Sequence, residues 1–529
     1  MSERLLTQTA PPPVQPISNK RWQRPAGVDR LAIPLTILLI AAIGLPRLPR
    51  GACFDDAGEL QLACATWGVA HPPGYAAYIS IGHIATLIPG VEPAFAITLL
   101  CFGSGLIALA LGGLLMVRLG LNAWVAAATM LILFATPPFW TNLLSPEVYM
   151  PSLALMAGAV LALLRFARLG VARDLLIAAL CFGLLVSARP NAILFGPFVA
   201  IVAWPAMRAN LPVRRMRASL SMMAVFLLPT VYSVVQVVAR DTPATTYNYI
   251  AQYNTEFHTL PEATDVAARL RRAVWLMSAA QYRSNLDVDP RGGLKRIAEA
   301  VPTWPFEGVP RWTLLVAGLF GLAWIARRSR DAGILLLGVG FSNLVFVSIY
   351  EPAAGGMARD ALDRLPLFFA GYVCVGSSLS FLAPTNTKRS RRIAAGGLLV
   401  AAVLWTMRDM PNRPRVAADV DASHWLAWAA LNELPQNARI YATWRTAAPL
   451  WYATRVQGVR PDIEVMNAAP SNWMRIENER ATAAMIGRVF LTEPIDPPTG
   501  WSLSEHGALW RLAPSSRPDS PDGGDLHPE

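Results

Sequence analysis

Charged residues are scarce in this chain. Only 15% of its 529 residues are Asp, Glu, Lys or Arg, while 54% are hydrophobic; an average globular domain carries about 25% charged residues. Much of the surface must therefore face something other than water. This shortage excludes an ordinary soluble enzyme, a disordered protein and a fibrous repeat.

Cysteine is also rare, with five in the chain. Cys101, Cys181 and Cys374 lie in apolar segments, where cysteine serves as a small core residue. Cys53 and Cys64 share one more polar segment, and either a disulfide in an oxidising compartment or burial as thiols fits them. The sequence has no Cys/His cluster with zinc-ligand spacing, no P-loop, no Gly-x-Gly-x-x-Gly and no repeat, which argues against nucleotide hydrolysis at a Walker site.

Long hydrophobic runs are abundant. A transmembrane helix needs roughly 20 mostly apolar residues, with about 17 as the lower limit, and about eleven segments approach or meet this requirement. They are 29–46, 92–117, 122–138, 146–164, 174–188, 191–207, 218–239, 312–326, 332–350, 365–383 and 393–408. The first segment lacks a convincing cleavage site, so we expect a span rather than a signal peptide. The fold class predicted is a polytopic α-helical membrane protein.

Positive charge exceeds negative charge, with 46 Lys and Arg against 35 Asp and Glu. Cytoplasmic loops are enriched in Lys and Arg, and a cytoplasmic N-terminus places every main basic cluster on the cytoplasmic side. These clusters lie at 20–30, 165–173, 208–217, 327–330 and 388–392. Membrane topology therefore explains the positive excess, and nucleic acid is not expected as a partner.

This topology divides the chain into four parts. They are a disordered cytoplasmic tail at 1–28, a transmembrane domain at 29–408, a small extracytoplasmic α/β domain at 409–513 and a disordered tail at 514–529. Within the α/β domain, we expect helices at 422–433 and 447–455 and strands at 439–443, 462–466, 488–492 and 508–512. Two long loops of the transmembrane domain, 47–91 and 240–311, face outward.

The first outward loop carries three carboxylates within five residues, Asp55, Asp56 and Glu59. The apolar run that follows, as far as Trp67, predicts an amphipathic helix on the membrane surface, and residues 76–88 predict a second. Such helices beside a cluster of acids would roof a cavity open to lipid and water. The alternative is that the acids only solvate a loop.

Other ionisable residues lie at the outward ends of predicted spans. Glu147, in the run that ends with Tyr149, is either functional or an interfacial anchor. Arg189, at the tip between the fifth and sixth spans, could hold a phosphate or pair with an acid. The charged run 359–364 is either functional or a solvated loop. Because all these residues share the outward face, we expect a site there that uses a lipid-carried donor.

Three stretches resemble a known family. The acid-small-Gly-Glu block Asp56-Ala57-Gly58-Glu59 is followed by Trp67-Gly68-Val69-Ala70-His71-Pro72-Pro73-Gly74-Tyr75. The others are Phe139-Trp140 through Glu147-Val148-Tyr149, and Leu450-Trp451-Tyr452 with Gly458-Val459-Arg460-Pro461-Asp462-Ile463. This signature is similar to that of the multi-span protein O-mannosyltransferases, whose bacterial members were long labelled a domain of unknown function. Residues 187–191 and 351–364 depart from the pattern, which leaves the donor and acceptor open.

The resemblance implies a GT-C glycosyltransferase with two surface helices in its first outward loop. Its donor is a polyprenyl-phosphate sugar, with mannose expected, and its acceptor is a hydroxyl of an extracytoplasmic protein or glycan. Asp56 is then the base of an inverting transfer, and Arg189 contacts the donor phosphate. Glu59 and His71 shape the loop or bind the acceptor. The candidates for substrate binding are Asp55, Glu59, His71, Glu147, Tyr149 and Arg189.

Two other classes stay open at this point. A transporter or lipid flippase often shows internal repeats and broken helices near the midplane, and neither is clear here. A non-catalytic scaffold would use the outward α/β domain to bind envelope partners. Carboxylates beside a phosphate could also hold a divalent metal, although no ligand set is evident. The expected location is the bacterial inner membrane.

Overall fold

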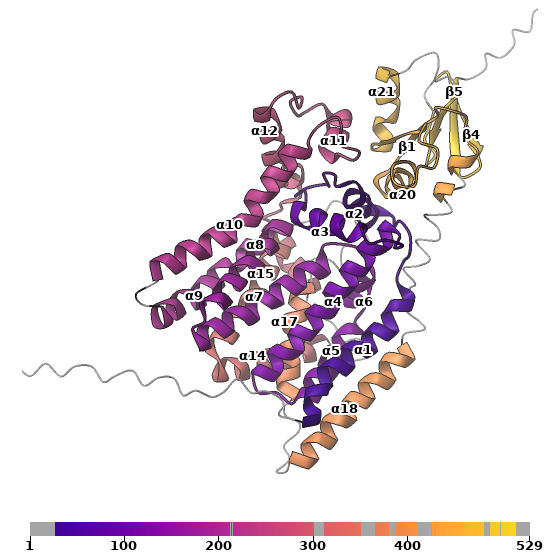
Figure 1. Cartoon of the computed structure of the whole chain (residues 1–529). Helices are drawn as coiled ribbons and strands as arrows, with labels where there is room; N and C mark the ends of the chain where they lie inside the picture. The colour runs from indigo at the N-terminus through magenta and orange to yellow at the C-terminus, as the bar shows by residue number, and fades with distance from the viewer. Residues whose placement is uncertain are drawn as a thin grey trace, which may run out of the picture.

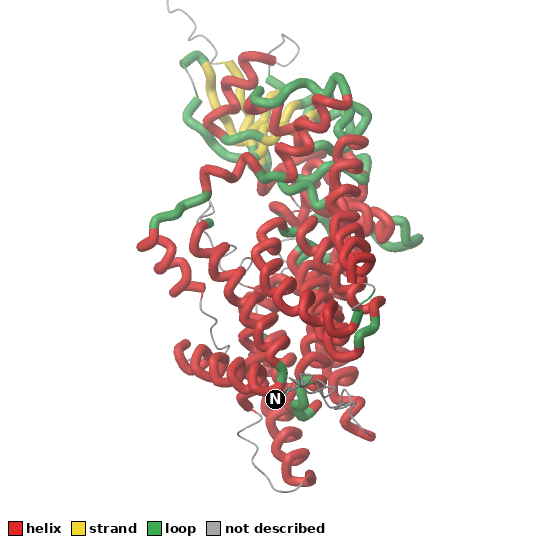
Figure 2. The backbone as a smooth tube through the Cα atoms, turned by 90° about the vertical axis from the view of Figure 1, so that its left-hand side faces the viewer, coloured by secondary structure: helices red, strands yellow, loops and turns green. Residues whose placement is uncertain are grey.

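The computed structural model describes six stretches of the chain: residues 27–300 except 212 and 214, 311–350, 365–379, 388–409, 423–480 except 424, 425 and 429, and 487–514 except 498. These stretches are mostly helical, with a small β-sheet near the C-terminus (Figure 2). The charged run at 359–364 and both predicted tails (apart from residues 27, 28 and 514) lie outside the described residues. Of the predicted helix 422–433, residues 422, 424, 425 and 429 are not described, while 423, 426–428 and 430–432 are helical, as expected.

A helix occupies each of the hydrophobic segments predicted as spans. They are α1 (Ala32–Gly44), α4 (Pro93–Arg118), α5 (Ala123–Phe134), α7 (Tyr149–Leu169), α8 (Ala172–Ala188), α9 (Gly196–Asn210), α10 (Arg215–Arg240), α14 (Arg311–Arg328), α15 (Arg330–Ile349), α17 (Leu365–Leu379) and α18 (Lys388–Asp409) (Figure 1). Capping explains several boundaries: the Glu92 carboxylate accepts from the Phe95 amide ahead of α4, and Gly170 ends α7 with a φ of 68°.

Six helical segments in the described stretches are long and apolar enough to cross a membrane. A seventh results if α5 and the short helix α6 (Pro137–Leu144), which meet at 76°, form one broken span. Other apolar helices are shorter, such as α8 with 17 residues. The membrane-spanning character is therefore supported, and the number eleven stays a prediction.

One end of the bundle gathers basic residues from several helices. The Arg168 guanidinium lies 3.5 Å from the Arg118 carbonyl, and the Asn210 amide donates to the last turn of α7. A Cβ atom at Gly120 would lie 2.9 Å from the guanidinium of Arg328. The ends of α4, α7, α9 and α14 therefore meet, and the side of the membrane that they face stays a prediction.

The first loop contains α2 (Asp55–Thr66) and α3 (Ala76–Thr86), which lie at the end of the bundle beside the C-terminal sheet (Figure 1). The prediction of an amphipathic interfacial helix ending at Trp67 was wrong for α2. All residues from Ala57 to Cys64 are buried, because helix α20 (Trp444–Arg455) packs against α2 from above.

The second long loop folds into α11 (Tyr249–Phe257), α12 (Val266–Met277), the turn η4 (Ala280–Asn285) and α13 (Pro290–Ala300). It is tied to the first loop through backbone hydrogen bonds. The Val69 amide donates to the Tyr247 carbonyl (3.0 Å) and the Tyr249 amide donates to the Val69 carbonyl (2.9 Å). A side chain at Gly68 would collide with the Tyr247 carbonyl at 2.4 Å, so glycine permits this approach.

The C-terminal region forms a five-stranded sheet in the order β2-β1-β3-β5-β4. The strands are β1 (Arg439–Ala442), β2 (Glu464–Asn467), β3 (Val489–Leu491), β4 (Trp501–His506) and β5 (Leu509–Pro514), with helices α20 and α21 (Pro470–Arg480). Strand β1 pairs in parallel with β2 and β3, while the β3–β5 and β4–β5 pairs are antiparallel. Four strands lie at the predicted runs, and β4 was not predicted.

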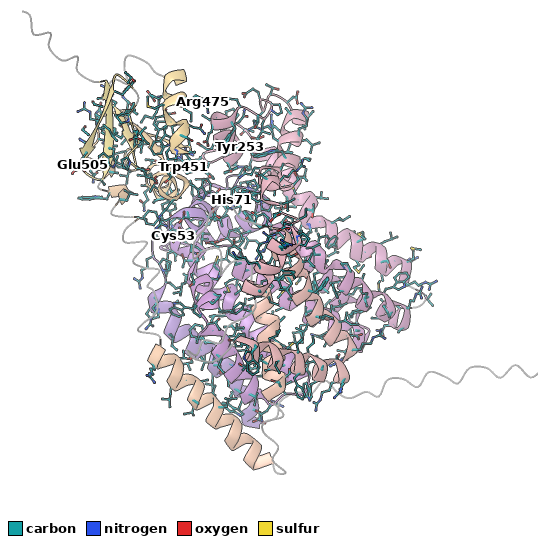
Figure 3. The ribbon with its side chains drawn as sticks, turned by 180° about the vertical axis from the view of Figure 1, so that it is seen from behind. Cys53, His71, Tyr253, Trp451, Arg475 and Glu505 are labelled. Atoms are coloured by element: carbon teal, nitrogen blue, oxygen red, sulfur yellow. The ribbon has the colours of Figure 1, made fainter. Side chains whose placement is uncertain are left out.

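This sheet region is docked on the loops through a shared apolar core. Leu60 of α2 and Ile79 of α3 belong to the same buried cluster as Leu450 and Tyr452 of α20. Figure 3 shows His71 and Cys53 at this boundary. Cys53 and Cys64 are both buried thiols, so the disulfide alternative does not hold in this structure.

Candidate active site

The acids of the first loop occupy the first turn of α2. Asp55 has a left-handed φ of 56°, and its exposed carboxylate accepts from Arg445 at 3.0 Å. The Asp56 carboxylate points to a different set of groups. Its Oδ1 accepts from the Trp444 indole N–H at 2.6 Å, and its Oδ2 lies 3.7 Å from Nε2 of His71.

Packing requires glycine at position 58, two residues after Asp56. A Cβ atom at Gly58 would lie 1.9 Å from the Cys53 carbonyl oxygen and 3.1 Å from Cβ of Ala448 in α20. Gly58 therefore allows α2 to approach both the preceding loop and the C-terminal helix. This contact gives a physical reason for glycine in the acid-small-Gly-Glu block.

Glu59 is the centre of a buried hydrogen-bond network. Its fully buried carboxylate accepts from the His71 amide (2.9 Å) and from the Tyr247 hydroxyl (3.0 Å), and it contacts Nδ1 of His71 at 3.0 Å. A buried charge is tolerated when hydrogen-bond donors surround it in this way. Of the two roles predicted for Glu59, the structure favours shaping the loop, because nothing outside the protein can reach the carboxylate.

His71 links the two carboxylates of α2. One ring nitrogen faces Glu59, and the other lies 3.3 Å from the Tyr75 hydroxyl and 3.7 Å from Asp56. Burial of the ring lowers its pKa, but the carboxylates of Asp56 and Glu59 outweigh burial and raise the pKa to about 9. The imidazole is therefore charged at neutral pH.

The turn from His71 to Tyr75 is held in a defined shape. The Gly74 amide donates to the His71 carbonyl at 2.7 Å, and the peptide bond between Pro72 and Pro73 is cis. Gly74 has a φ of 90°, and a Cβ atom there would lie 2.8 Å from the Leu276 side chain, so glycine is required. Tyr75 follows in the left-handed region with a φ of 47°. Conformations of this kind often mark functional sites.

Glu147 lies between α6 and α7. The Ser145 hydroxyl donates to its carboxylate at 3.2 Å. Burial and the nearby charge of Asp56 raise the pKa of Glu147 to about 8, although the Ser145 hydrogen bond and His71 act in the opposite direction. A carboxyl group with a pKa near the working pH suits proton transfer.

Arg189 ends α8, and its guanidinium lies 4.9 Å from the centre of the Tyr149 ring. Both residues line a pocket between helices of the bundle, beside the buried hydroxyl of Ser152. The remaining lining residues are mostly apolar: Leu153, Met156, Leu185, Asn191, Ala192, Phe195, Val339, Ser342, Asn343, Leu365 and Pro366.

The predicted site residues converge on Tyr75. Burial raises the pKa of the Tyr75 hydroxyl, and the charges of Asp56, Glu59 and Glu147 raise it further, while Arg189 lowers it. The charges of residues from α2, from the turn before α7 and from the end of α8 therefore all act on the hydroxyl of Tyr75. Direct contacts join Asp56, Glu59, His71 and Tyr75 in one group and Tyr149 and Arg189 in another, while the charges of Asp56, His71 and Asp55 act on Glu147.

Sequence reasoning missed the aromatic residues that surround His71. The ring centroid of His71 lies 5.9 Å from that of Trp444 and 6.3 Å from that of Tyr249, both edge to face. Trp444 lies six positions before the Leu450-Trp451-Tyr452 motif, and the resemblance of that tail motif to the same family was the available signal. No group of three or more His, Cys, Asp or Glu suited to a metal ion occurs in the described part of the chain.

The arrangement combines groups for acid–base chemistry with a basic, largely apolar pocket. Asp56 is half-exposed beside a charged imidazole, and Glu147 has a pKa close to neutral pH. Arg189 offers a cation at the pocket wall. Such a set of groups can accept a proton from a hydroxyl and can stabilise a departing anion.

Comparison with known proteins identifies the region that carries these residues. No curated protein matches the sequence. The fold is similar to a chain of the S. cerevisiae protein O-mannosyltransferase Pmt1-Pmt2 complex bound to the sugar donor, at 16% identity and a TM-score of 0.34, over 41% of this chain and 34% of that chain. It is also similar to the Archaeoglobus fulgidus oligosaccharyltransferase, at 13% identity and a TM-score of 0.43, over 84% of this chain and 65% of that chain.

The chain thus spans less than two thirds of the length of either solved relative. The family model of the protein O-mannosyl-transferase TMEM260 N-terminal domain matches residues 56–210, from the first acid of the block to the end of α9. The resemblance inferred from the sequence is therefore confirmed for residues 56–210, which are similar to the N-terminal domain of the TMEM260 protein O-mannosyltransferases.

Proposed function

We propose that the protein is a membrane glycosyltransferase that moves a hexose, mannose in the first instance, from a polyprenyl phosphate to a hydroxyl group outside the cytoplasm. The observation that carries this proposal is that the matched region 56–210 holds both a half-exposed carboxylate, Asp56, in contact with His71 and Trp444, and a pocket lined by Arg189. A carboxylate base and a cation for a phosphate are the two groups that such a transfer requires.

The pocket beside Arg189 supports a lipid-linked donor. Its apolar walls suit an isoprenoid chain, and the guanidinium suits a phosphate through charge-assisted hydrogen bonds. The buried hydroxyl of Ser152 also lines the pocket and has no hydrogen-bond partner among the described residues. A phosphate or sugar oxygen would supply one.

In the proposed reaction, the acceptor oxygen attacks the anomeric carbon of the donor in one displacement with inversion. The hydroxyl proton passes to the carboxylate of Asp56 as the new C–O bond forms. The bond from the anomeric carbon to the phosphate oxygen breaks, and polyprenyl phosphate leaves next to Arg189. Glu147 is close enough to influence the charge of the site and would orient the acceptor or the base.

The two ends of the bundle support an orientation of the protein in the membrane. The basic residues of α4, α7 and α14 meet at one end, and the site lies at the end that carries α2 and the sheet region. Under the inside-positive rule, the basic end faces the cytoplasm. The proposed site therefore faces outward, where cytosolic nucleotide-sugars are absent.

The decisive experiment replaces Asp56 with Asn in the full-length protein, reconstituted with radiolabelled polyprenyl-phosphate mannose and a Ser/Thr-rich acceptor peptide. We expect the rate of mannose transfer to fall by about 10²–10⁴-fold, the usual contribution of a general base. Glu505→Gln is the matched control, because this exposed acid lies on the sheet far from His71 (Figure 3).

Full activity of Asp56→Asn would refute the base assignment. Movement of the lipid across the bilayer without a covalent product would refute glycosyl transfer and favour the flippase alternative. Loss of activity in Glu505→Gln as well would mean that acidic residues act only through stability.

A further inference from the structure

The C-terminal region reaches the proposed base through two consecutive residues. Trp444 and Arg445 are the first two residues of α20. The Trp444 indole donates to Asp56 at 2.6 Å, and the Arg445 guanidinium donates to Asp55 at 3.0 Å and lies 4.7 Å from the Phe54 ring centre. Asp56 and Trp444 lie 388 positions apart along the chain.

The indole ring of Trp444 is fixed from several sides. Its centroid lies 5.9 Å from His71, 5.7 Å from Tyr249 and 6.3 Å from Trp451, each edge to face. Trp451 is itself anchored, because its indole donates to the Val465 carbonyl of β2 at 3.0 Å. The Trp444 side chain packs against both the core below α20 and the core of the second loop.

Helix α20 is in turn held by contacts with the start of α4 and with the second long loop. The Tyr452 hydroxyl donates to Glu92 and accepts from the Ala94 amide at 2.9 Å, both at the start of α4. The Arg455 guanidinium donates to the Thr246 carbonyl at 3.0 Å. Because the C-terminal end of the helix is anchored in this way and the Trp444 ring is packed at the other end, the position of Trp444 relative to Asp56 is set by the fold.

The Trp444 contact makes the two oxygens of Asp56 unequal. Oδ1 accepts the indole proton, while Oδ2 faces His71 at 3.7 Å and is available to accept another proton. We propose that the C-terminal region is part of the active site and that Trp444 is a positioning residue, which orients the Asp56 carboxylate so that Oδ2 takes the acceptor proton. This inference rests on the proposed role of Asp56 as base.

A hydrogen bond to a charged group contributes about 1.5–3 kcal/mol, which corresponds to about 10–100-fold in rate. The test is Trp444→Phe in the full-length protein, which removes the indole N–H and keeps an aromatic ring. We expect kcat for mannose transfer to fall by about 10–100-fold, with KM for polyprenyl-phosphate mannose within about twofold, because the donor pocket is untouched.

Trp473→Phe is the matched control. Its indole donates to the Ala468 carbonyl at 2.8 Å inside the same region and belongs to a different core cluster. This variant also loses an indole hydrogen bond within the C-terminal region, so its unfolding temperature should fall while its kcat stays unchanged. Should Trp444→Phe fail to purify as a folded protein, Trp444→Met, which also lacks an N–H donor in its side chain, takes its place with the same expected loss in kcat against Trp473→Phe.

The outcomes separate the two proposals. An active wild type with an inactive Asp56→Asn and a fully active Trp444→Phe would overturn the positioning role and leave the proposed function standing. Equal losses of kcat in Trp444→Phe and Trp473→Phe would also overturn it, because the effect would then be structural. A wild type without transfer activity would overturn the proposed function and, with it, the role assigned to Trp444.

Discussion

At the scale of single residues, His71 decides the charge of the site. Its ring lies between Glu59 and Asp56 with only 7% of its side chain exposed. The two carboxylates overcome the effect of burial and raise the pKa to about 9 from an ordinary value of 6.5. A histidine that is charged at neutral pH can hold both carboxylates in place but cannot serve as a base.

We predict that stability depends on the proton of His71. The folded protein binds this proton more tightly than the unfolded chain, so its contribution is complete below pH 6.5 and is lost as the pH rises through about 9. The shift corresponds to about 3 kcal/mol. The unfolding temperature, measured from pH 6 to 10, should fall steeply with rising pH in the wild type and less steeply in His71→Gln.

Glu147 contributes to the lower part of the same slope, because its pKa is raised from 4.5 to about 8 and the stability tied to its proton is lost as the pH rises through about 8. The slope that remains in His71→Gln between pH 6 and 8 should therefore become smaller in His71→Gln/Glu147→Gln. Identical slopes in the wild type and in His71→Gln would contradict the charged state assigned to the imidazole.

Part of this site could be predicted from the sequence alone. Asp56, Glu59 and His71 stand in a compact signature, and their closeness was predictable because the turn between them is short. The contact with Trp444 was not, because it depends on how α20 lies on α2. The role of Glu59 also needed the fold, since a buried carboxylate and a substrate ligand look the same in a sequence.

At the scale of elements, the second long loop is held together by a buried ion pair. Arg272 of α12 donates to the Asp241 carboxylate at 2.6 Å and 2.9 Å, and both side chains are almost fully buried. Asn248 also donates to Asp241, which connects the pair to the backbone pairing with the first loop. The ion pair thus positions the segment that carries Tyr247 and Tyr249.

We predict that Arg272→Met destabilises this loop strongly. Removing one partner leaves a buried, uncompensated charge, a change that costs about 3–5 kcal/mol. Asp241→Asn/Arg272→Met should recover much of the loss, because neither charge then remains. Limited proteolysis of the full chain, with cleavage sites mapped to residues 241–300, measures the effect.

Arg271→Met is the control, since Arg271 is the exposed neighbour on the same helix. Equal cleavage in Arg271→Met and Arg272→Met would contradict the role of the pair.

Element positions were the most predictable part of the fold. Hydrophobic runs of the right length produced helices, and β-branched or aromatic runs such as 439–443 and 488–492 produced strands. The prediction was wrong where a distant partner decides the environment. Helix α2 has the composition of a surface helix, but α20 covers it.

At the scale of the whole molecule, the sheet region is fastened to both outward loops. Besides the contacts of α20, the Glu256 carboxylate at the end of α11 accepts from the Ala469 amide (3.0 Å) and from the Asn472 side chain (2.7 Å) at the start of α21. These contacts and the shared core make the loops and the sheet region one unit above the bundle (Figure 2).

We predict that Glu256→Ala loosens this unit without unfolding the bundle. Amides in α21 should exchange with solvent about 10–100-fold faster, because the lost hydrogen bonds to a buried charge are worth about 1.5–3 kcal/mol. Hydrogen exchange read by mass spectrometry measures the change. Glu262→Ala, an exposed acid of the same loop, should leave exchange unaltered; unchanged exchange in both variants would refute the docking role of Glu256.

The contact between Trp444 and Asp56 also bears on biosynthesis. Asp56 is made early and Trp444 almost 400 residues later, so a ribosome releases the proposed base long before the tryptophan that orients it. If the positioning role holds, a nascent or truncated chain already inserted in the membrane has its donor pocket but not an oriented base. Catalysis would then begin only when the last part of the chain has crossed the membrane and folded, which protects the lipid-linked sugar from unfinished enzyme.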